Sequence, residues 1–452
     1  MSPSPDASPL RLLLGVQQHE RRRLALAACF FFCVLASYYL LRPLRDAMGV
    51  AGGVDNLPWL FMGTLGATVL VSPLFAWLVS RWSRRQFVGV SYRLLIICLG
   101  LFYLAWTLSG ESWRLWIGRA FFVWLSVYVL FAVSLMWSVM ADSFPDREAR
   151  RLFPLIGAGG TLGGIAGSAL AGVLTESHGM GIPMLLAALF LEAAVRAMQA
   201  LTLRSAAESP EQARIDRQAV GGQVREVLTG LLRSPYLLGV AGFILLYTIG
   251  STFLYLLQAG IVAAMASDIQ ARGTLFARID LFVNIATLAS QLLLTRHLIA
   301  RMGVPMTLAL LPLLSLLGFA ALAIWPAYAL LIFVQAGRRA INFAIASPTR
   351  ELLYVPLPRG EKFKVKNFID TFVFRAGDQI GALTQAGLNT VGAGIAATAL
   401  LGLPLCAGWL ALAFWLGRRH RQLTLDPIAP TPDVSATVPP SASGEAHATG
   451  SS

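Results

Sequence analysis

The chain has 452 residues, of which 56% are hydrophobic and only 13% charged, and its formal net charge at pH 7 is +13. Soluble domains carry about 25% charged residues, so this composition excludes an ordinary soluble protein and predicts an integral membrane protein. The basic excess does not indicate nucleic-acid binding, because it is spread over short loops between apolar segments and is not gathered on one soluble face.

Apolar runs of roughly 20 residues, the length that a spanning helix requires, follow one another along nearly the whole chain. Residues 1–23 form a cytoplasmic lead that ends in basic residues, and no cleavage site follows, so a first span starting at residue 24 is expected to be retained. Further spans are predicted at about 57–79, 87–108, 115–140, 152–174 and 182–203. The polar segment 204–235 has the composition of a cytoplasmic connector.

Another six apolar runs follow this connector. They lie at about 236–264, 274–295, 303–324, 326–348, 367–390 and 392–416. The remaining residues, 417–452, are predicted to be a disordered cytoplasmic tail, because they end in a Pro-, Ser-, Ala- and Thr-rich stretch. We therefore expect an all-α membrane protein with twelve transmembrane helices in two six-helix bundles, 24–203 and 236–416, which is a major-facilitator-like arrangement.

Lys and Arg residues divide unequally between the two sides of this topology. Of the 36, 25 fall on the side of the termini, 4 on the other side and 7 inside predicted spans. Because cytoplasmic loops carry the excess of basic residues, both termini are expected in the cytoplasm and the protein in the inner (plasma) membrane of a bacterium, as a multi-pass chain.

Charged residues occur where the first apolar run ends, in the stretch Ser37–Gly49. On a helix Tyr38, Arg42 and Arg45 share one face, and Arg42 and Asp46 form an i, i+4 pair. Such a face points at protein or water and not at lipid. We expect this stretch at the non-cytoplasmic mouth of the first span, with a structural or substrate-binding role.

Later spans also carry charge, with a surplus of arginine. A charged side chain at the bilayer centre costs about 2.5–3.5 kcal/mol, so it normally faces a bundle interior or an aqueous cavity. Arg119, Arg338 and Arg339 have no acidic residue within helical reach, whereas Arg375 and Asp378 are spaced to pair. The surplus of positive charge suits an anionic substrate.

Polar residues line one face of several spans in the second half. The faces are Tyr247, Ser251, Tyr255 and Gln258; Asp280, Asn284, Thr287 and Gln291; Gln335, Arg338 or Arg339, and Asn342; and Thr371, Arg375, Asp378 and Gln385. The ninth and twelfth spans carry no charge, as expected if the third helix of each triplet faces lipid. His and Cys are absent from the polar faces, so no metal site, cofactor or enzymatic centre is predicted.

The fifth span contains a run of small residues, GAGGTLGGIAGSALAG, at 157–172. Small residues three and four apart are typical of close helix packing in membranes. A phosphate-binding loop is the weaker interpretation, because no Lys-Ser/Thr follows the glycines.

Several motifs in order resemble the ATP/ADP translocase family, the nucleotide exchangers of plastids and intracellular bacteria, which are related to the major facilitators. The motifs are LRPLRDAMGV (41–50), LPWLF (57–61), MWSVMADSF (136–144), EARRLFPLIGAGG (148–160), SPYL (234–237) and KNFIDTFVFRAGD (366–378). The resemblance covers about residues 37–390 and is to the divergent members found in free-living bacteria. It implies a major-facilitator-like antiporter of nucleotides.

Three departures from that family concern charge. The resemblance implies a lysine in the segment that matches LPWLF, an acidic residue in the seventh span and a lysine late in the eleventh. In this chain Phe61, Tyr255 and Asp378 stand at these positions. The scaffold is therefore kept, while strict ATP/ADP exchange is not implied.

The sequence favours a secondary active transporter that moves an anionic solute, either a nucleotide or a phosphorylated metabolite, by alternating access. Candidate residues for substrate binding or gating are Arg42, Arg45, Asp46, Arg119, Tyr255, Asp280, Asn284, Arg338, Arg339, Asn342, Arg375 and Asp378. The expected partners are a small anionic solute and the lipid bilayer, with no nucleic acid, and the protein is expected to be a monomer. The alternatives are a facilitator for a lipid-like or amphipathic cargo and a non-transporting membrane scaffold.

Overall fold

A computed structural model describes residues 17, 18, 20–81, 84–144, 146–208, 232–354, 365, 366 and 368–425, and nearly all of these are helical. The first half consists of α2 (Glu20–Ala51), η1 (Val54–Asn56), α3 (Leu57–Arg81), α4 (Arg84–Leu108), α5 (Glu111–Ser143), α6 (Asp146–His178) and α7 (Gly181–Glu208). The second half begins with α10 (Pro235–Met265), whose first turn is capped by the Ser234 side chain.

The rest of the second half contains helices that continue through five-residue π-helical segments. α11 (Ile269–Ser290) continues into η2 (Gln291–Thr295), which leads into α12 (Arg296–Ile324). The next span combines α13 (Tyr328–Ile341), η3 (Asn342–Ala346) and α14 (Ser347–Leu352). Then follow η4 (Ile369–Val373) with α16 (Phe374–Thr390), and α17 (Ile395–Leu425).

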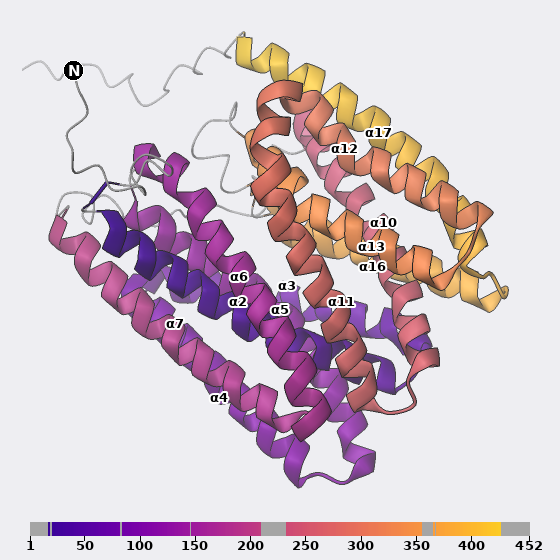
Figure 1. Cartoon of the computed structure of the whole chain (residues 1–452), viewed down its shortest axis with the longest axis horizontal. Helices are drawn as coiled ribbons and strands as arrows, with labels where there is room; N and C mark the ends of the chain where they lie inside the picture. The colour runs from indigo at the N-terminus through magenta and orange to yellow at the C-terminus, as the bar shows by residue number, and fades with distance from the viewer. Residues whose placement is uncertain are drawn as a thin grey trace, which may run out of the picture.

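The expected architecture of two six-helix bundles is confirmed. In Figure 1 α2 to α7 lie together at the lower left and α10 to α17 at the upper right, with α6 and α11 adjacent between them. The first residues of α2 and the last of α17 both lie toward the upper left, as an even number of spans requires. We call the opposite side, where α2 ends and α3 begins, the distal side; the sequence predicts it to be non-cytoplasmic.

Eleven helical segments in the described part of the chain are long and apolar enough to cross a membrane. The predicted span that is not among them, 367–390, is the eleventh in chain order and corresponds to η4 and α16. It is more polar than the others because it carries Asp370, Arg375 and Asp378. Such a helix is acceptable in a membrane only where neighbouring protein covers its polar face.

The predicted ends of three segments need correction, since the helices extend past the apolar runs. α2 begins inside the expected lead 1–23, because Glu20 and Arg23 in its first turn pair with Arg151 and Glu148 of α6. α7 runs into the expected connector as far as Glu208, and residues 209–231 lie outside the described part. α17 continues to Leu425, so 417–425 are helical and not disordered; 426–452 are not described.

α2 and α6 pack very closely, as the run of small residues predicts. A Cβ atom at Gly163 would overlap the carbonyl oxygen of Phe32, and one at Gly167 would overlap that of Ala36. Only glycine allows the two backbones to approach in this way. The close-packing interpretation of residues 157–172 is therefore confirmed, and α2 is held firmly within the first half.

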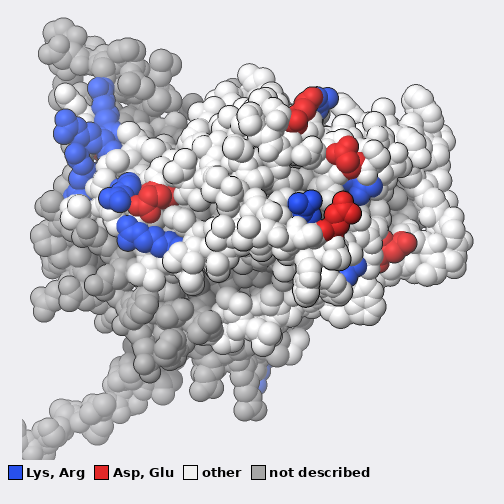
Figure 2. Space-filling view, turned by 90° about the horizontal axis from the view of Figure 1, so that it is seen from below, with Lys and Arg blue, Asp and Glu red and all other residues white. Residues whose placement is uncertain are grey.

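The two halves share packed surface along their length. α11 packs against α6 and α2, and α16 packs against α3. The apolar core of the first half continues into Leu256 of α10 and Phe276 of α11. The face shown in Figure 2 carries its described charged side chains toward its two ends, with a broad uncharged region between them. Exposed apolar side chains such as Leu70, Leu94 and Leu189 suit contact with lipid.

Candidate functional site

The charged stretch Ser37–Gly49 forms the last turns of α2, which ends at Ala51, and it is covered by protein. Asp46, for example, exposes only 2% of its surface. That the stretch stands at the non-cytoplasmic mouth of the first span stays a prediction. Burial is tolerated because Arg42, Arg45 and Asp46 are paired with one another and with the second half. Such pairing offsets the cost of removing charges from water.

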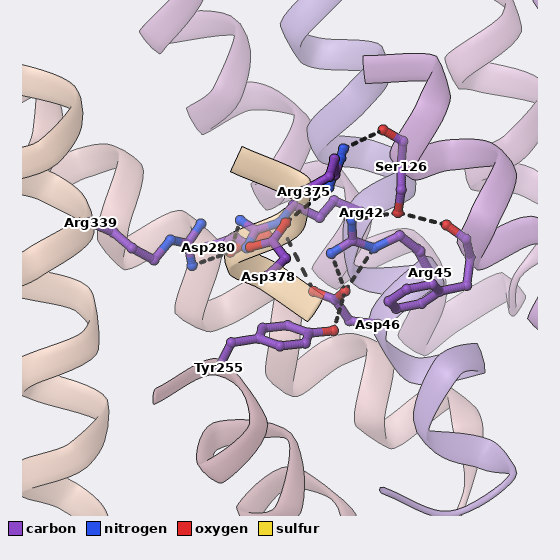
Figure 3. Close-up of polar contacts among 10 residues, drawn as sticks. Arg42, Arg45, Asp46, Ser126, Tyr255, Asp280, Arg339, Arg375 and Asp378 are labelled. Atoms are coloured by element: carbon purple, nitrogen blue, oxygen red, sulfur yellow. Dashed lines mark hydrogen bonds and ion pairs between the residues drawn. The ribbon is translucent and has the colours of Figure 1, made fainter. Parts of the chain in front are cut away.

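Asp280 joins an arginine from each half of the molecule (Figure 3). Its Oδ1 accepts hydrogen bonds from Arg42 Nη1 at 2.7 Å and from Arg339 Nη1 at 2.8 Å. Arg42 belongs to α2, whereas Asp280 and Arg339 belong to α11 and α13. Hydrogen bonds between ionised groups are about twice as strong as neutral ones. We call this three-residue arrangement the Asp280 clamp.

Asp46 forms a second connection between the halves. Its Oδ1 accepts from Arg45 Nε at 2.9 Å and from Arg45 Nη2 at 2.5 Å. The same oxygen accepts from the hydroxyl of Tyr255, on α10 of the second half, at 2.9 Å. Arg45 is held in place by the Phe122 ring, whose centroid lies 4.9 Å from its guanidinium carbon, and by the Ser126 hydroxyl at 3.4 Å.

Arg375 of α16 forms a third connection. Its Nη2 donates to the backbone carbonyl of Ser126 in α5 at 2.8 Å, and its Nη1 donates to Asp378 Oδ2 at 3.2 Å. The other oxygen of Asp378 accepts from the Thr252 hydroxyl at 3.2 Å. The predicted pairing of Arg375 with Asp378 is thus confirmed. The structure adds that Arg375 reaches across to the first half at the same time.

The charged members of this interhalf network are four arginines and three aspartates: Arg42, Arg45, Arg339 and Arg375 with Asp46, Asp280 and Asp378. Ser126, Thr252 and Tyr255 bond to them and complete the network. The network thus carries one formal positive charge in excess, and the arginine side chains are at most 15% exposed. An uncompensated buried charge is costly, so an entering anion would be attracted to it.

Four predicted site residues lie outside the network. Arg338 is buried and points the other way from Arg339: its Nε donates to Ser315 Oγ at 2.6 Å and its Nη1 to the Gly250 carbonyl at 3.3 Å. Arg119 stacks on the Trp116 ring, 4.6 Å from its centroid.

The two predicted asparagines also stand apart from the ion pairs. Asn284 donates to Ser168 Oγ at 3.2 Å, which joins α11 to α6. Asn342 is buried at the start of η3, and its side-chain oxygen has no hydrogen-bond partner among the described residues. Asn284 therefore contributes to packing between the halves, and Asn342 retains a free acceptor near Arg339.

Two network residues escaped prediction. Ser126 lies in an apolar part of α5 and contributes mainly its backbone carbonyl, which no side-chain pattern reveals. Thr252 is adjacent to Ser251, which the polar face of α10 had suggested instead. A shift of one residue rotates a helix position by about 100°, so only the actual rotation of α10 separates the two.

The three positions at which the family resemblance implies lost charges lie at or beside this network. The Phe61 ring contacts the Phe122 and Tyr255 rings edge-on, with centroids 6.0 and 5.9 Å away. Tyr255 in turn bonds Asp46, and Asp378 bonds Arg375. The replacements therefore alter one continuous region between the halves.

A pocket of about 810 Å³ opens near the distal ends of α10 and α16. Its walls are mainly apolar and include Leu256, Leu257 and Ile261, while Asp55 and Gln385 are among its polar lining residues. The described lining contains no basic residue and none of the charged residues of the network. The side-chain oxygen of Gln385 is buried without a hydrogen-bond partner in the described part of the chain, although its amide nitrogen donates to Asn389.

The described residues contain no group of three or more His, Cys, Asp or Glu that could hold a metal ion. All four cysteines are free. The groups that the structure shows between the halves are guanidinium, carboxylate, hydroxyl and amide groups, and guanidinium groups can bind anions through paired hydrogen bonds.

Comparison with known proteins agrees with this architecture, although no family model matches the chain. The chain is 24% identical to ADP,ATP carrier protein 2 of Chlamydia trachomatis serovar D, over 87% of both chains. It is 22% identical to ADP,ATP carrier protein 2 of Chlamydia pneumoniae, over 88% of both. It superposes on the nucleoside transporter NupG with a TM-score of 0.60 at 13% identity, covering 87% of this chain and 98% of that one. The resemblance to the ATP/ADP translocases and the major-facilitator-like fold are both confirmed.

Proposed function

We propose that this protein is a secondary active transporter of an anionic solute. The chain is similar to the ADP,ATP carriers over most of its length and has a major-facilitator-like fold. Membrane transport, and not enzymatic catalysis, is the activity that these similarities and the membrane-spanning helices support. The cargo in this proposal is a nucleotide or another phosphorylated metabolite.

The observation that carries the proposal is the buried network between the halves, with its excess of positive charge. Guanidinium groups bind carboxylates and phosphates through paired hydrogen bonds, so these arginines suit an anionic cargo. The network draws on α2, α10, α11, α13 and α16, which are the helices that would wall a central path.

Alternating access requires that polar connections between the halves open. Three of them run through Asp280, Asp46 and Arg375, and others join α6 to α11 through Ser168 and Asn284 and through Glu176 and Arg278. Each half is packed as a unit, since α2 and α6 meet backbone to backbone in the first half and α12 packs closely against α17 in the second. Rigid-body rocking of one half against the other is therefore the motion we propose. The charge bias of the loops supports placing both termini in the cytoplasm.

One observation favours a lipid-like or amphipathic cargo instead. The distal pocket is largely apolar and has no basic residue in its described lining, so it suits an apolar body better than a phosphate group. This second candidate uses the same scaffold and the same motion. It differs in predicting transport of an amphiphile and no transport of small anions.

Counter-exchange in proteoliposomes tests the proposal. Vesicles containing purified protein and preloaded with ATP, ADP, a sugar phosphate or a dicarboxylate are offered the same labelled solutes outside. We expect uptake of at least one anion that depends on an internal anion and is lost in Arg339→Gln. Arg278→Gln, which removes a 67% exposed arginine from α11, should leave uptake unchanged. Monodisperse, correctly inserted protein that moves none of these anions would refute the proposal, and transport of a labelled lysolipid would favour the second candidate.

A further inference from the structure

Asp280 occupies the position between two arginines that an anionic ligand would be expected to take. Its carboxylate receives one guanidinium from each half, at 2.7 and 2.8 Å, on the same oxygen. We propose that Asp280 is an internal substitute for the substrate: it holds Arg42 and Arg339 in the empty transporter and is displaced by an anionic group of the substrate. This inference rests on the proposed transport function and adds to it the means by which binding opens the distal side.

The Asp280 clamp is left incompletely bonded. Asp280 Oδ2 and Arg339 Nη2 are buried without hydrogen-bond partners among the described residues. An unsatisfied buried polar group is costly, and more so when it is charged. The empty clamp is therefore less stable than its two short bonds suggest, and a ligand that satisfies both atoms has an advantage over the internal carboxylate.

These two free atoms define the chemistry of the ligand. Arg339 Nη2 is a donor and needs an acceptor, which a phosphate or carboxylate oxygen provides in the paired geometry that guanidinium prefers. Asp280 Oδ2 is an acceptor and needs a donor, such as a hydroxyl or amino group. The fitting class is a phosphorylated or carboxylated solute that carries a hydroxyl or amine close to its anionic group.

Among the described acidic residues of the network, only Asp280 joins arginines of opposite halves. Asp46 is bonded to Arg45, its own neighbour in α2, so that ion pair can persist when the halves separate. Asp378 is bonded to Arg375 and Thr252, which both belong to the second half. Separation of the halves must break the Asp280–Arg42 pair, and a substrate anion would compensate Arg42 at that moment.

Such an arrangement explains obligatory exchange. A ligand shifts a conformational equilibrium only as far as its affinities for the two states differ. Without an anion, opening removes the 2.7 Å bond of Arg42 to Asp280 and leaves it only the 4.0 Å contact with Asp46, a carboxylate that already bonds Arg45, so the empty protein stays closed on the distal side. With an anion bound, the charge stays compensated in both states and the halves can move.

Asp280→Asn tests this inference, because it removes the charge and keeps the size of the side chain. Glu176→Gln is the matched control, since it neutralises another carboxylate that pairs with α11, at an exposed position with Arg278. Spin labels attached at Glu111 and Thr390, near the distal ends of α5 and α16, report separation of the halves in a variant without the native cysteines. The same variants are loaded with labelled ATP to compare efflux with and without external ATP.

We expect Asp280→Asn to raise the distally open population about tenfold without any ligand, as loss of one charged contact predicts. Efflux of ATP into buffer should approach the rate seen with external ATP, while Glu176→Gln resembles the wild type. The inference is overturned if Asp280→Asn leaves the distance distribution unchanged. It is also overturned if Asp280→Asn raises the open population but its ATP efflux still requires external ATP. If Asp280→Asn is not monodisperse, Arg42→Gln removes the same Arg42–Asp280 contact and serves in its place for the ligand-free distances, with the same expected rise of the open population. A wild type that moves no anion refutes the proposed transport function, whereas the ligand-free distances still decide whether Asp280 holds the halves together.

Discussion

The Tyr255→Phe substitution gives the cleanest measure of how strongly the halves are held. It deletes one oxygen atom, which donates to Asp46 Oδ1 at 2.9 Å, and leaves the ring that contacts Phe61 in place. A hydrogen bond to a charged acceptor contributes about 1.5–3 kcal/mol. In the distally open state this bond is absent from the wild type and from the variant alike. The substitution therefore changes the free energy of the closed state and hardly that of the open state.

The expected shift of the equilibrium between the closed and open states follows from this bond energy. Since 1.4 kcal/mol corresponds to a factor of ten, Tyr255→Phe should shift the equilibrium toward the open state by about 10- to 100-fold. Spin-label distances between Glu111 and Thr390 measure the two populations without any substrate. A wild type that is closed in nearly all molecules should become a resolvable mixture of two distances.

Tyr247→Phe is the matched control for this experiment. It removes the same atom from the same helix, two turns earlier, where no hydrogen bond of the hydroxyl is seen among the described residues. The Tyr247 ring contacts Phe374, Trp409 and the Arg350 guanidinium. We expect its distance distribution to match that of the wild type. An equal shift in both variants would show that loss of a tyrosine hydroxyl from α10, and not of the Asp46 contact, is responsible. No shift in Tyr255→Phe would refute the reasoning.

Two further predictions concern packing and the direction of adjacent side chains. Gly163→Leu should give little monodisperse protein, because the side chain would overlap the Phe32 carbonyl. Gly157→Leu, where no atom lies within 4 Å of the added Cβ, should resemble the wild type in size-exclusion chromatography. Equal behaviour of the two variants would contradict the close packing of α2 and α6. Arg339→Met should raise the KM of the transported anion about tenfold or more, since a charged hydrogen bond is lost. Arg338→Met should change KM by less than about threefold, because Arg338 bonds Ser315 and Gly250 away from the network. A similar rise of KM in Arg338→Met and Arg339→Met would place Arg338 in the binding site.

Composition and hydropathy determined most of the architecture. A long chain with 13% charge and repeated apolar runs has few stable states outside a bilayer, so the helices follow from satisfying the backbone within lipid. The ordered motifs identified the family resemblance, and the small residues of 157–172 predicted close helix packing. These features are local or periodic, so the amino-acid sequence alone reveals them.

The identity of several buried charged residues was also predictable, because lipid excludes them. Arg42, Asp46, Asp280, Arg339 and Arg375 were all selected on this ground and all meet in the network. Their partners could not be selected in the same way. The pairs Arg42–Asp280 and Asp46–Tyr255 join residues more than 200 positions apart, and no spacing rule connects them.

Tertiary structure alone decided which of two adjacent arginines serves the site. Arg338 and Arg339 have the same chemistry and the same sequence environment, yet about 100° of helix rotation turns one toward Ser315 and the other toward Asp280. The extent of α2 was decided in the same way, since its charged last turns are stabilised by groups of α10 and α11 that the sequence places far away. The sequence by itself determined that charges would be buried between helices; the docking of the two halves determined which charges meet, because pairing across the interface depends on rotation and register.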